Sequence, residues 1–217
     1  MPGDTHPPIY AHRFGSDYGP ESSRSALEHT LSGDVDGIEA DIVLSGDDRV
    51  LARHDPILSY STDLTGWVQV LEVIPRDLPF QLDVKAYADH ELARRTAERA
   101  CEVMREHGTA ARAEVISFFS GACEAASAAG LRSRLIAWSD YAPEALAEWV
   151  VGHGMIGVSF EGFILSERVV RPLHDAGLTI SVGAVNKLDQ VRKLEPLRVD
   201  ILVSDRPHEL RSELADG

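Results

Sequence analysis

Short runs of apolar and β-branched residues alternate along the chain with longer stretches in which apolar residues recur every three or four positions. The short runs predict buried strands, and the longer stretches predict amphipathic helices. Strands are expected at Ile9–His12, Gly37–Val43, Gln81–Lys85, Glu114–Ser117, Arg134–Trp138, Met155–Phe160, Thr179–Val182 and Asp200–Val203. Helices are expected near residues 22–32, 89–107, 120–130, 143–152, 166–176, 187–195 and 206–214. This alternation is typical of βα units built around a parallel sheet.

Eight strands and seven helices in alternation predict a (β/α)8 TIM barrel that takes up residues 1–217 as a single domain. The length of 217 residues suits one core of that size. An open, doubly wound sheet has the same alternation and remains the alternative. One region departs from the pattern: in residues 44–80, a second short strand at Val50–His54 and a loop rich in Ser, Thr, Asp and Pro take the place of a clear helix.

The amino-acid composition and net charge argue against some classes of binding partner. Apolar residues make up 44% and charged residues 26% of the chain, as in an ordinary globular protein. The formal net charge of −14 repels polyanions, so we expect neither nucleic-acid binding nor stable association with a membrane. No secretion signal or membrane-span pattern is found, which favours a cytoplasmic protein. The two cysteines, Cys101 and Cys123, lack metal or redox spacing and are expected in the core.

Carboxylates mark the early strands, whose C-terminal ends carry the chemistry in a barrel of this kind. Glu39 and Asp41 are two residues apart on one strand, so their side chains face the same way, and Asp83 lies in the next strand. Taken singly, each acid is more simply a surface strand end or half of a salt bridge. Three carboxylates in apolar strands are costly without a cation, and a site made only of oxygen ligands suits Mg²⁺ or Ca²⁺.

Lys85 follows Asp83 on the same strand, and it is one of only three lysines in the chain. The other two, Lys187 and Lys193, fall in a solvated helix. A lysine in an apolar strand is suited to bind a phosphate oxygen as a point charge. The alternative is a buried ion pair with Asp83 that serves only to hold the barrel together.

Two histidines, His12 and His54, are the last residues of expected strands in this carboxylate-rich part of the chain. Hydrolysis of a phosphodiester needs a base to activate the attacking oxygen and an acid to protonate the departing alkoxide, and imidazole suits either role near neutral pH. The other histidines fall in the N-terminal tail, in expected helices or at the ends of those helices. The two roles are not assigned between His12 and His54.

Together these residues resemble, in order and spacing, the motifs of the glycerophosphodiester phosphodiesterase family. The matching segments are His12-Arg13, Pro20-Glu21-Ser22, Glu39-Ala40-Asp41, His54-Asp55, Asp83-Val84-Lys85, Ser117-Phe118 and Ser204-Asp205-Arg206-Pro207. The resemblance covers nearly the whole chain. It implies a TIM barrel that hydrolyses a small-molecule glycerophosphodiester to sn-glycerol 3-phosphate and an alcohol.

The resemblance also implies a role for each matching residue. One divalent cation, Mg²⁺ or Ca²⁺, would be bound by Glu39, Asp41 and Asp83. His12 and His54 would act as general base and general acid. The implied substrate-binding residues are Arg13, Lys85, Glu21, Phe118 and Asn186.

The sequence departs from the family pattern at a few positions near these motifs. Phe14 follows His12-Arg13 where glycine is usual, and Asp83 stands where glutamate is usual. Gly183 replaces a tryptophan, and the pocket wall could be refilled by Trp138, Phe118 or Phe163. Two alternatives therefore stay open: a phosphodiesterase acting on a lysophospholipid or other diester through a cyclic phosphate, or a catalytically inactive barrel that binds a phosphorylated ligand.

Overall fold

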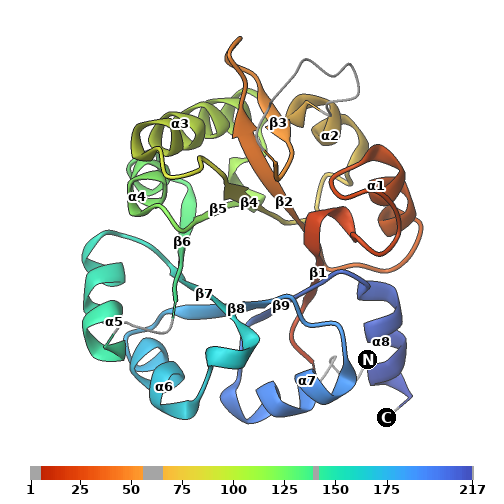
Figure 1. The fold of residues 1–217 in the computed structure, drawn as a ribbon, viewed down its shortest axis with the longest axis vertical. Coiled ribbons are helices and arrows are strands. Elements are labelled where there is room, and N and C mark those ends of the chain that lie inside the picture. The colour runs from red at the N-terminus through yellow and green to blue at the C-terminus, as the bar shows by residue number, and fades with distance from the viewer. Residues whose placement is uncertain (1–5, 56–65, 139–141, 217) are drawn as a thin grey trace.

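The computed structural model describes residues 6–55, 66–138 and 142–216. Within them, eight parallel strands close into a barrel surrounded by helices (Figure 1). The ring closes because the last strand pairs with the first, which also pairs with the second. The predicted (β/α)8 barrel is confirmed, and the open doubly wound sheet is wrong. The barrel strands, in spatial order, are β1 (Ile9–Ala11), β2 (Gly37–Leu44), β4 (Phe80–Val84), β5 (Ala113–Ser117), β6 (Arg132–Ile136), β7 (Gly157–Glu161), β8 (Thr179–Gly183) and β9 (Ile201–Ser204).

The helices lie outside the barrel, and the seven predicted ones are confirmed to within two residues at each end. Polar side chains begin two of them: Ser23 accepts a hydrogen bond from the Ala26 amide, and Asp89 from the Leu92 amide. The α-helices are α1 (Arg24–Leu31), α2 (Trp67–Val73), α3 (His90–Glu106), α4 (Ser120–Ala128), α5 (Pro143–Gly152), α6 (Glu167–Asp175), α7 (Leu188–Leu194) and α8 (Pro207–Ala215). Short 3₁₀ turns are η1 (His12–Phe14), η2 (Ala110–Arg112), η3 (Gly162–Ile164) and η4 (Glu195–Leu197).

Helix α2 corrects the expectation that no helix lies between residues 44 and 80. Its sequence, WVQVLEV, contains three valines, which favour strands over helices. The helix forms because Trp67 and Val70, three residues apart, are both buried on its inner side. The Trp67 indole packs against Phe80 of β4, with ring centroids 5.3 Å apart, so tertiary packing overrides the local preference.

Strand β3 (Val50–Ala52) confirms the predicted extra strand, which ends two residues earlier than expected. It pairs antiparallel with the outer end of β2, where Leu44 faces Val50 and Ile42 faces Ala52. It is the single antiparallel strand in the described part of the sheet. This hairpin leads directly to His54 and therefore delivers that residue to the same rim of the barrel as the end of β2.

Side chains alternate between the two faces of each barrel strand, and the outer face is apolar. On β4, Phe80, Leu82 and Val84 lie in the apolar core between the strands and the helices, whereas Gln81 and Asp83 face the barrel interior. Cys101 and Cys123 are free thiols buried in this helix–strand core, as predicted. Alternation thus separates a hydrophobic outer layer from an interior that is available for polar groups.

The lower part of the barrel interior is filled by a buried polar cluster. Gln81 donates a hydrogen bond to Glu114 at 2.9 Å, and the same carboxylate lies 3.3 Å from the Arg134 guanidinium. Arg134 is 1% exposed and also donates to the Thr179 carbonyl at 2.8 Å. Because the interior is plugged here, a ligand has access only from the opposite end.

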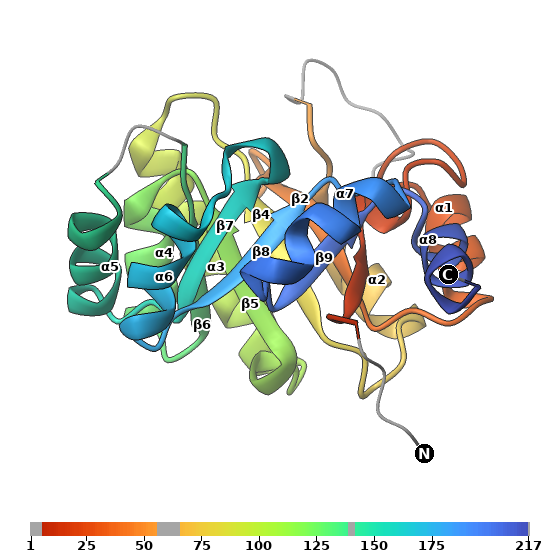
Figure 2. The same cartoon turned by 90° about the horizontal axis from the view of Figure 1, so that it is seen from below.

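That open end is the rim where the strands finish, as in other parallel barrels. Figure 2 shows the loop after β1 and the turn after β7 at the upper rim, whereas the chain enters β1 from below. Within the part of the chain that the structure describes, none of the helices has the length and apolar composition that a bilayer crossing demands.

Candidate active site

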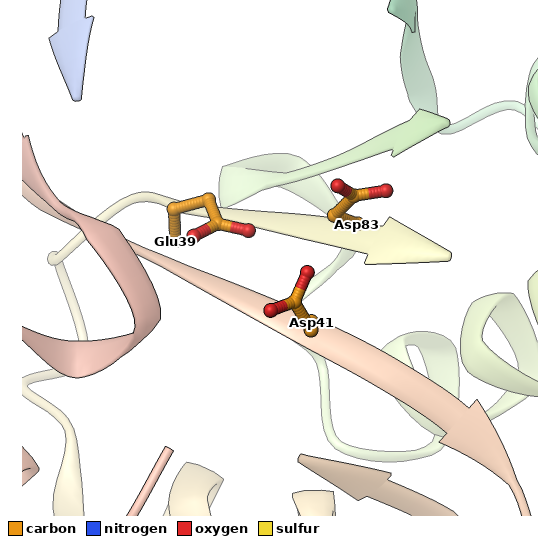
Figure 3. Close-up of side chains that lie close together, drawn as sticks. All are labelled: Glu39, Asp41 and Asp83. Carbon is orange, nitrogen blue, oxygen red and sulfur yellow. The ribbon is translucent and has the colours of Figure 1, made fainter. Parts of the chain in front are cut away.

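Three carboxylates meet inside the upper rim of the barrel (Figure 3). Glu39 and Asp41 come from β2, and Asp83 comes from β4, which pairs with β2 so that Asp41 and Asp83 are register partners. One carboxylate oxygen from each lies within 4.8 Å of the others. The three residues are only 3%, 1% and 6% exposed. The sequence prediction that these acids converge is therefore confirmed as geometry.

The donor set fits a hard divalent cation. Burial raises the pKa of Glu39, and the nearby charge of Asp41 raises it further. Burial likewise raises the pKa of Asp83 to about 7, with Lys85 opposing the shift and Asp41 adding to it. Asp83 Oδ1 is buried and has no hydrogen-bond partner among the described residues. An orphaned oxygen beside two other carboxylates is what a cation with oxygen ligands would satisfy.

Lys85 lies against the three acids. Its Nζ is 3.0 Å from Asp41 Oδ1 and 2.5 Å from Asp83 Oδ2. Burial disfavours the ammonium, but Asp83 and Asp41 together outweigh it and raise the Lys85 pKa, so the side chain stays charged. The Lys–Asp pair considered as the structural alternative is thus present. A charged side chain in this position is also available to an anionic ligand at the rim.

Arg13 contributes the second cation of the site. Its Nε lies 2.8 Å from Asp41 Oδ2, and its backbone amide donates to Glu39 at 3.0 Å. The guanidinium also donates to Glu21 at 2.6 Å, which places Glu21 beside Arg13 and outside the carboxylate triad. Arg13 has a left-handed φ of 49°. The turn after β1 therefore holds an unfavourable backbone conformation that brings an amide and a guanidinium to the carboxylates.

Phe14, the residue found where glycine is usual, also has a left-handed φ, of 67°. Glycine adopts this conformation freely, whereas phenylalanine adopts it at a cost. The ring is fully buried and stacks near Trp67 of α2, with centroids 6.3 Å apart. Burial of the ring offsets the cost of the backbone conformation, so the substitution anchors the first loop on α2.

His12 is positioned beside the triad by a hydrogen-bonded pair. Its Nε2 is 3.9 Å from Glu39 Oε2, and its Nδ1 lies 2.6 Å from Asp205 Oδ1 at the end of β9. Burial disfavours the charged imidazole, but the hydrogen bond that His12 donates to Asp205 and the charge of Glu39 outweigh this effect and raise the His12 pKa. Despite partial burial, Asp205 has a lowered pKa because His12, Ser16 and Asn186 all donate hydrogen bonds to it.

Asp205 is the site residue to which sequence analysis assigned no role. Its carboxylate accepts from Asn186 Nδ2 at 2.5 Å, and its backbone amide donates to Asn186 Oδ1 at 2.8 Å. Asn186, expected to touch substrate, is thus engaged with Asp205. The available signal was the place of Asp205 directly after the last strand, beside the strand that carries His12.

His54 reaches the rim after β3 but is more loosely held. Its side chain is 35% exposed, and among the described residues its hydrogen-bond partner is Asp55, at 3.1 Å. The two histidines that sequence analysis grouped together therefore differ: His12 is fixed next to the carboxylates, whereas His54 lies at the edge of the site.

An aromatic wall extends from Lys85 along the rim. The Lys85 ammonium lies 5.8 Å from the centroid of the Phe118 ring, and Phe118 stacks on Trp138 with centroids 5.3 Å apart. The two residues are 40% and 55% exposed. Phe118 and Trp138 thus form an exposed stacked pair beside Lys85, while the side chain of Phe163 lies outside what the structure describes.

Comparison with known proteins gives short matches in sequence. A stretch of 61 residues, 28% of the chain, is 39% identical to an uncharacterized protein of Bacillus subtilis. A stretch of 62 residues is 42% identical to a glycerophosphodiester phosphodiesterase of Bacillus altitudinis. Each match spans only 25% of the length of that relative. No family model matches the chain.

Comparison of folds covers almost the whole chain. A phosphodiesterase of Oleispira antarctica, solved with its product sn-glycerol 3-phosphate, superposes with a TM-score of 0.85 at 20% identity, over 98% of both chains. A glycerophosphodiester phosphodiesterase of Parabacteroides distasonis gives 0.83 at 19% identity, over 96% of this chain and 97% of that one. One from Thermotoga maritima gives 0.79 at 18% identity, over 97% and 99%. The resemblance to this family is thus confirmed at the level of the fold.

Proposed function

We propose that the protein hydrolyses a glycerophosphodiester to sn-glycerol 3-phosphate and an alcohol, with one divalent cation, Mg²⁺ or Ca²⁺. The observation that carries this proposal is the buried triad of Glu39, Asp41 and Asp83 with His12 Nε2 only 3.9 Å from Glu39. The fold shared with solved glycerophosphodiester phosphodiesterases supports the same reaction class.

Glu39, Asp41 and Asp83 would hold the cation. When bound, the cation supplies positive charge that stabilises the charge developing on the phosphoryl oxygens. It also relieves the repulsion among the three carboxylates. Lys85 and Arg13, which now lie against Asp41, would then be free to bind the phosphate as a point charge and as a fork of donors.

His12 would exchange a proton with the reacting oxygen through Nε2. The ionised Asp205 carboxylate accepts a hydrogen bond from His12 Nδ1. The proton of the neutral imidazole therefore stays on Nδ1, and Nε2 faces the triad. His54 would serve as the partner of opposite role. Its exposed position at the rim suits exchange with a departing alcohol or with water.

The remaining substrate-binding residues divide by their contacts. Phe118 would contact the substrate directly, because its ring is exposed next to Lys85. Glu21 would act by holding Arg13, and Asn186 by holding Asp205. A small-molecule substrate, a single domain over residues 1–217, a cytoplasmic location, and the lack of nucleic-acid or stable membrane binding all stay predictions.

The test is release of glycerol 3-phosphate from glycerophosphocholine and glycerophosphoethanolamine, with and without Mg²⁺ or Ca²⁺. We expect turnover that depends on the cation in the parent protein and falls by roughly a hundredfold or more in His12→Ala. Circular dichroism and calorimetric cation binding confirm that each protein is folded and loaded. A folded, cation-bound parent that turns over neither diester contradicts the proposal.

A further inference from the structure

The interior-facing residues at the top of successive strands form a continuous edge of the mouth that leads away from the carboxylates. Asp83 pairs in register with Ile116, and Phe118 is two residues further along the same face of β5. Ile136 pairs with Ser159, so Trp138 and Glu161 continue the matching faces of β6 and β7. The edge therefore runs from Lys85 through Phe118 and Trp138 toward Glu161.

The aromatic part of this edge is exposed where a ligand would lie. One side of Phe118 is taken by the Lys85 ammonium and another by the Trp138 indole. Trp138 is 55% exposed, the most of the large apolar residues found exposed in the described chain. Stacked aromatic surface left open beside buried charges is typical of a binding site.

Glu161 supplies negative charge at the far end of the edge. It is exposed, and its side chain has no hydrogen-bond or ion-pair partner within residues 6–55, 66–138 and 142–216. Its register partner on β8 is Gly183, which carries no side chain, and the Val203 side chain of β9 packs against the backbone there. A separate hollow of about 420 Å³ lies between Glu161 and α7, and Lys193 of α7 also lines it.

We infer that Trp138 and Glu161 form a subsite for a quaternary ammonium group on the alcohol portion of the substrate. This inference rests on the proposed function, which sets the phosphate at the triad and Lys85. A substituent that extends from that phosphate along the aromatic edge meets an open indole face and then a free carboxylate. Tryptophan is the side chain that attracts such cations best, and a nearby carboxylate adds to the attraction.

The negative charge of Glu161 favours a quaternary ammonium group over an acyl chain in this subsite. An apolar tail would cover the indole but would leave the Glu161 carboxylate desolvated and unpaired, which is costly. A choline-type group satisfies both the ring and the carboxylate. The net charge of −14 also favours a cationic group at the mouth over an anionic one.

The test compares glycerophosphocholine with its neutral isostere, the 3,3-dimethylbutyl ester, in which carbon replaces the quaternary nitrogen. We expect the parent to prefer the choline ester through a KM that is about tenfold lower. Trp138→Leu and Glu161→Gln should each reduce this preference, measured as the ratio of kcat/KM for the two esters, about threefold to tenfold.

Matched controls come from α5, away from the mouth. Trp149→Leu removes an indole that stacks on His153, and Glu148→Gln removes an exposed carboxylate. Both should keep the parent preference. A preference that persists in Trp138→Leu and Glu161→Gln, or a loss that is equal for the two esters, overturns the inference. So does a larger effect of Trp138→Leu on lysophosphatidylcholine than on glycerophosphocholine, because it would indicate an acyl subsite.

A binding measurement separates this inference from the proposed function. Choline is titrated calorimetrically into the cation-loaded parent and into Trp138→Leu. Saturable binding that is lost in the variant supports the subsite even if the parent hydrolyses no diester, in which case the proposed reaction alone fails. Turnover of both esters without any preference, together with no choline binding, overturns the subsite and leaves the reaction standing.

Discussion

His12 Nδ1 lies 2.6 Å from Asp205 Oδ1, although the two residues are 193 positions apart in the chain. They meet because β1, which ends just before His12, pairs with β9, which ends just before Asp205. The contact sets the tautomer and the orientation of the imidazole and turns Nε2 toward Glu39. Asp205 is therefore a positioning residue for the proposed reaction.

Asp205→Asn should lower kcat by roughly a hundredfold while leaving KM for the diester nearly unchanged. An asparagine can still accept a hydrogen bond but cannot stabilise a charged imidazole. The measurement is steady-state release of glycerol 3-phosphate. The matched control is Glu209→Gln on α8, which removes a carboxylate that accepts a hydrogen bond from the Tyr18 hydroxyl. This variant should retain full kcat. Equal kcat in Asp205→Asn and the parent would contradict the assigned role.

Asp205 should also contribute stability that depends on pH. Its pKa in the folded protein is lowered, so its contribution is fully present above the ordinary aspartate pKa and is lost as the pH falls through the folded value. We expect Asp205→Asn to lower the free energy of unfolding by about 1–2 kcal/mol at pH 7. Urea titrations at pH 7 and at acid pH measure this, and the difference between parent and variant should shrink on acidification below pH about 4.

Removal of one carboxylate from the triad should stabilise the cation-free protein and at the same time weaken cation binding. Glu39 is buried beside Asp41, and both effects raise its pKa, so its ionised form destabilises the cation-free protein. Glu39→Gln should raise the melting temperature of the cation-free protein by a few degrees and abolish the further rise on adding Mg²⁺ or Ca²⁺. Differential scanning calorimetry in chelator and in excess cation provides the comparison. An unchanged response to cation in the variant would remove Glu39 from the ligand set.

Arg134 should matter for stability alone. It is 1% exposed and pairs with Glu114 below the site, so Arg134→Ala removes the buried cation of that carboxylate and leaves it the exposed Arg132 and the Gln81 amide. The expected loss is about 3–5 kcal/mol in the free energy of unfolding, measured in urea. The double variant Arg134→Met, Glu114→Leu should recover much of it. The kcat of protein that remains folded should equal that of the parent, and a specific loss of kcat would contradict this assignment.

The triad could be predicted because two local rules suffice. Glu39 and Asp41 are two residues apart on a strand, and Asp83 follows in the neighbouring parallel strand, so the pleat and the strand order bring all three together. The strand and helix bounds followed in the same way from the periodicity of apolar residues. Neither inference requires knowledge of contacts between distant parts of the chain.

The features that escaped prediction depend on distant packing. Local pattern could not exclude an open sheet, because closure depends on the pairing of β1 with β9. Helix α2 was missed because its valines resemble a strand, and burial of Trp67 against Phe80 decides the outcome. The role of Asp205 was missed for the same reason, since its partner His12 lies at the other end of the sequence.

The pairing of β1 with β9 both closes the barrel and brings Asp205 next to His12. A chain that lacks β9 has no Asp205 to orient His12, and one that lacks β1 has no His12 at all. The proposed proton-transfer pair is therefore divided between the first and last barrel strands of the sequence. Glu39, Asp41 and Asp83 come instead from the adjacent strands β2 and β4, so the proposed cation ligands do not depend on the pairing of β1 with β9.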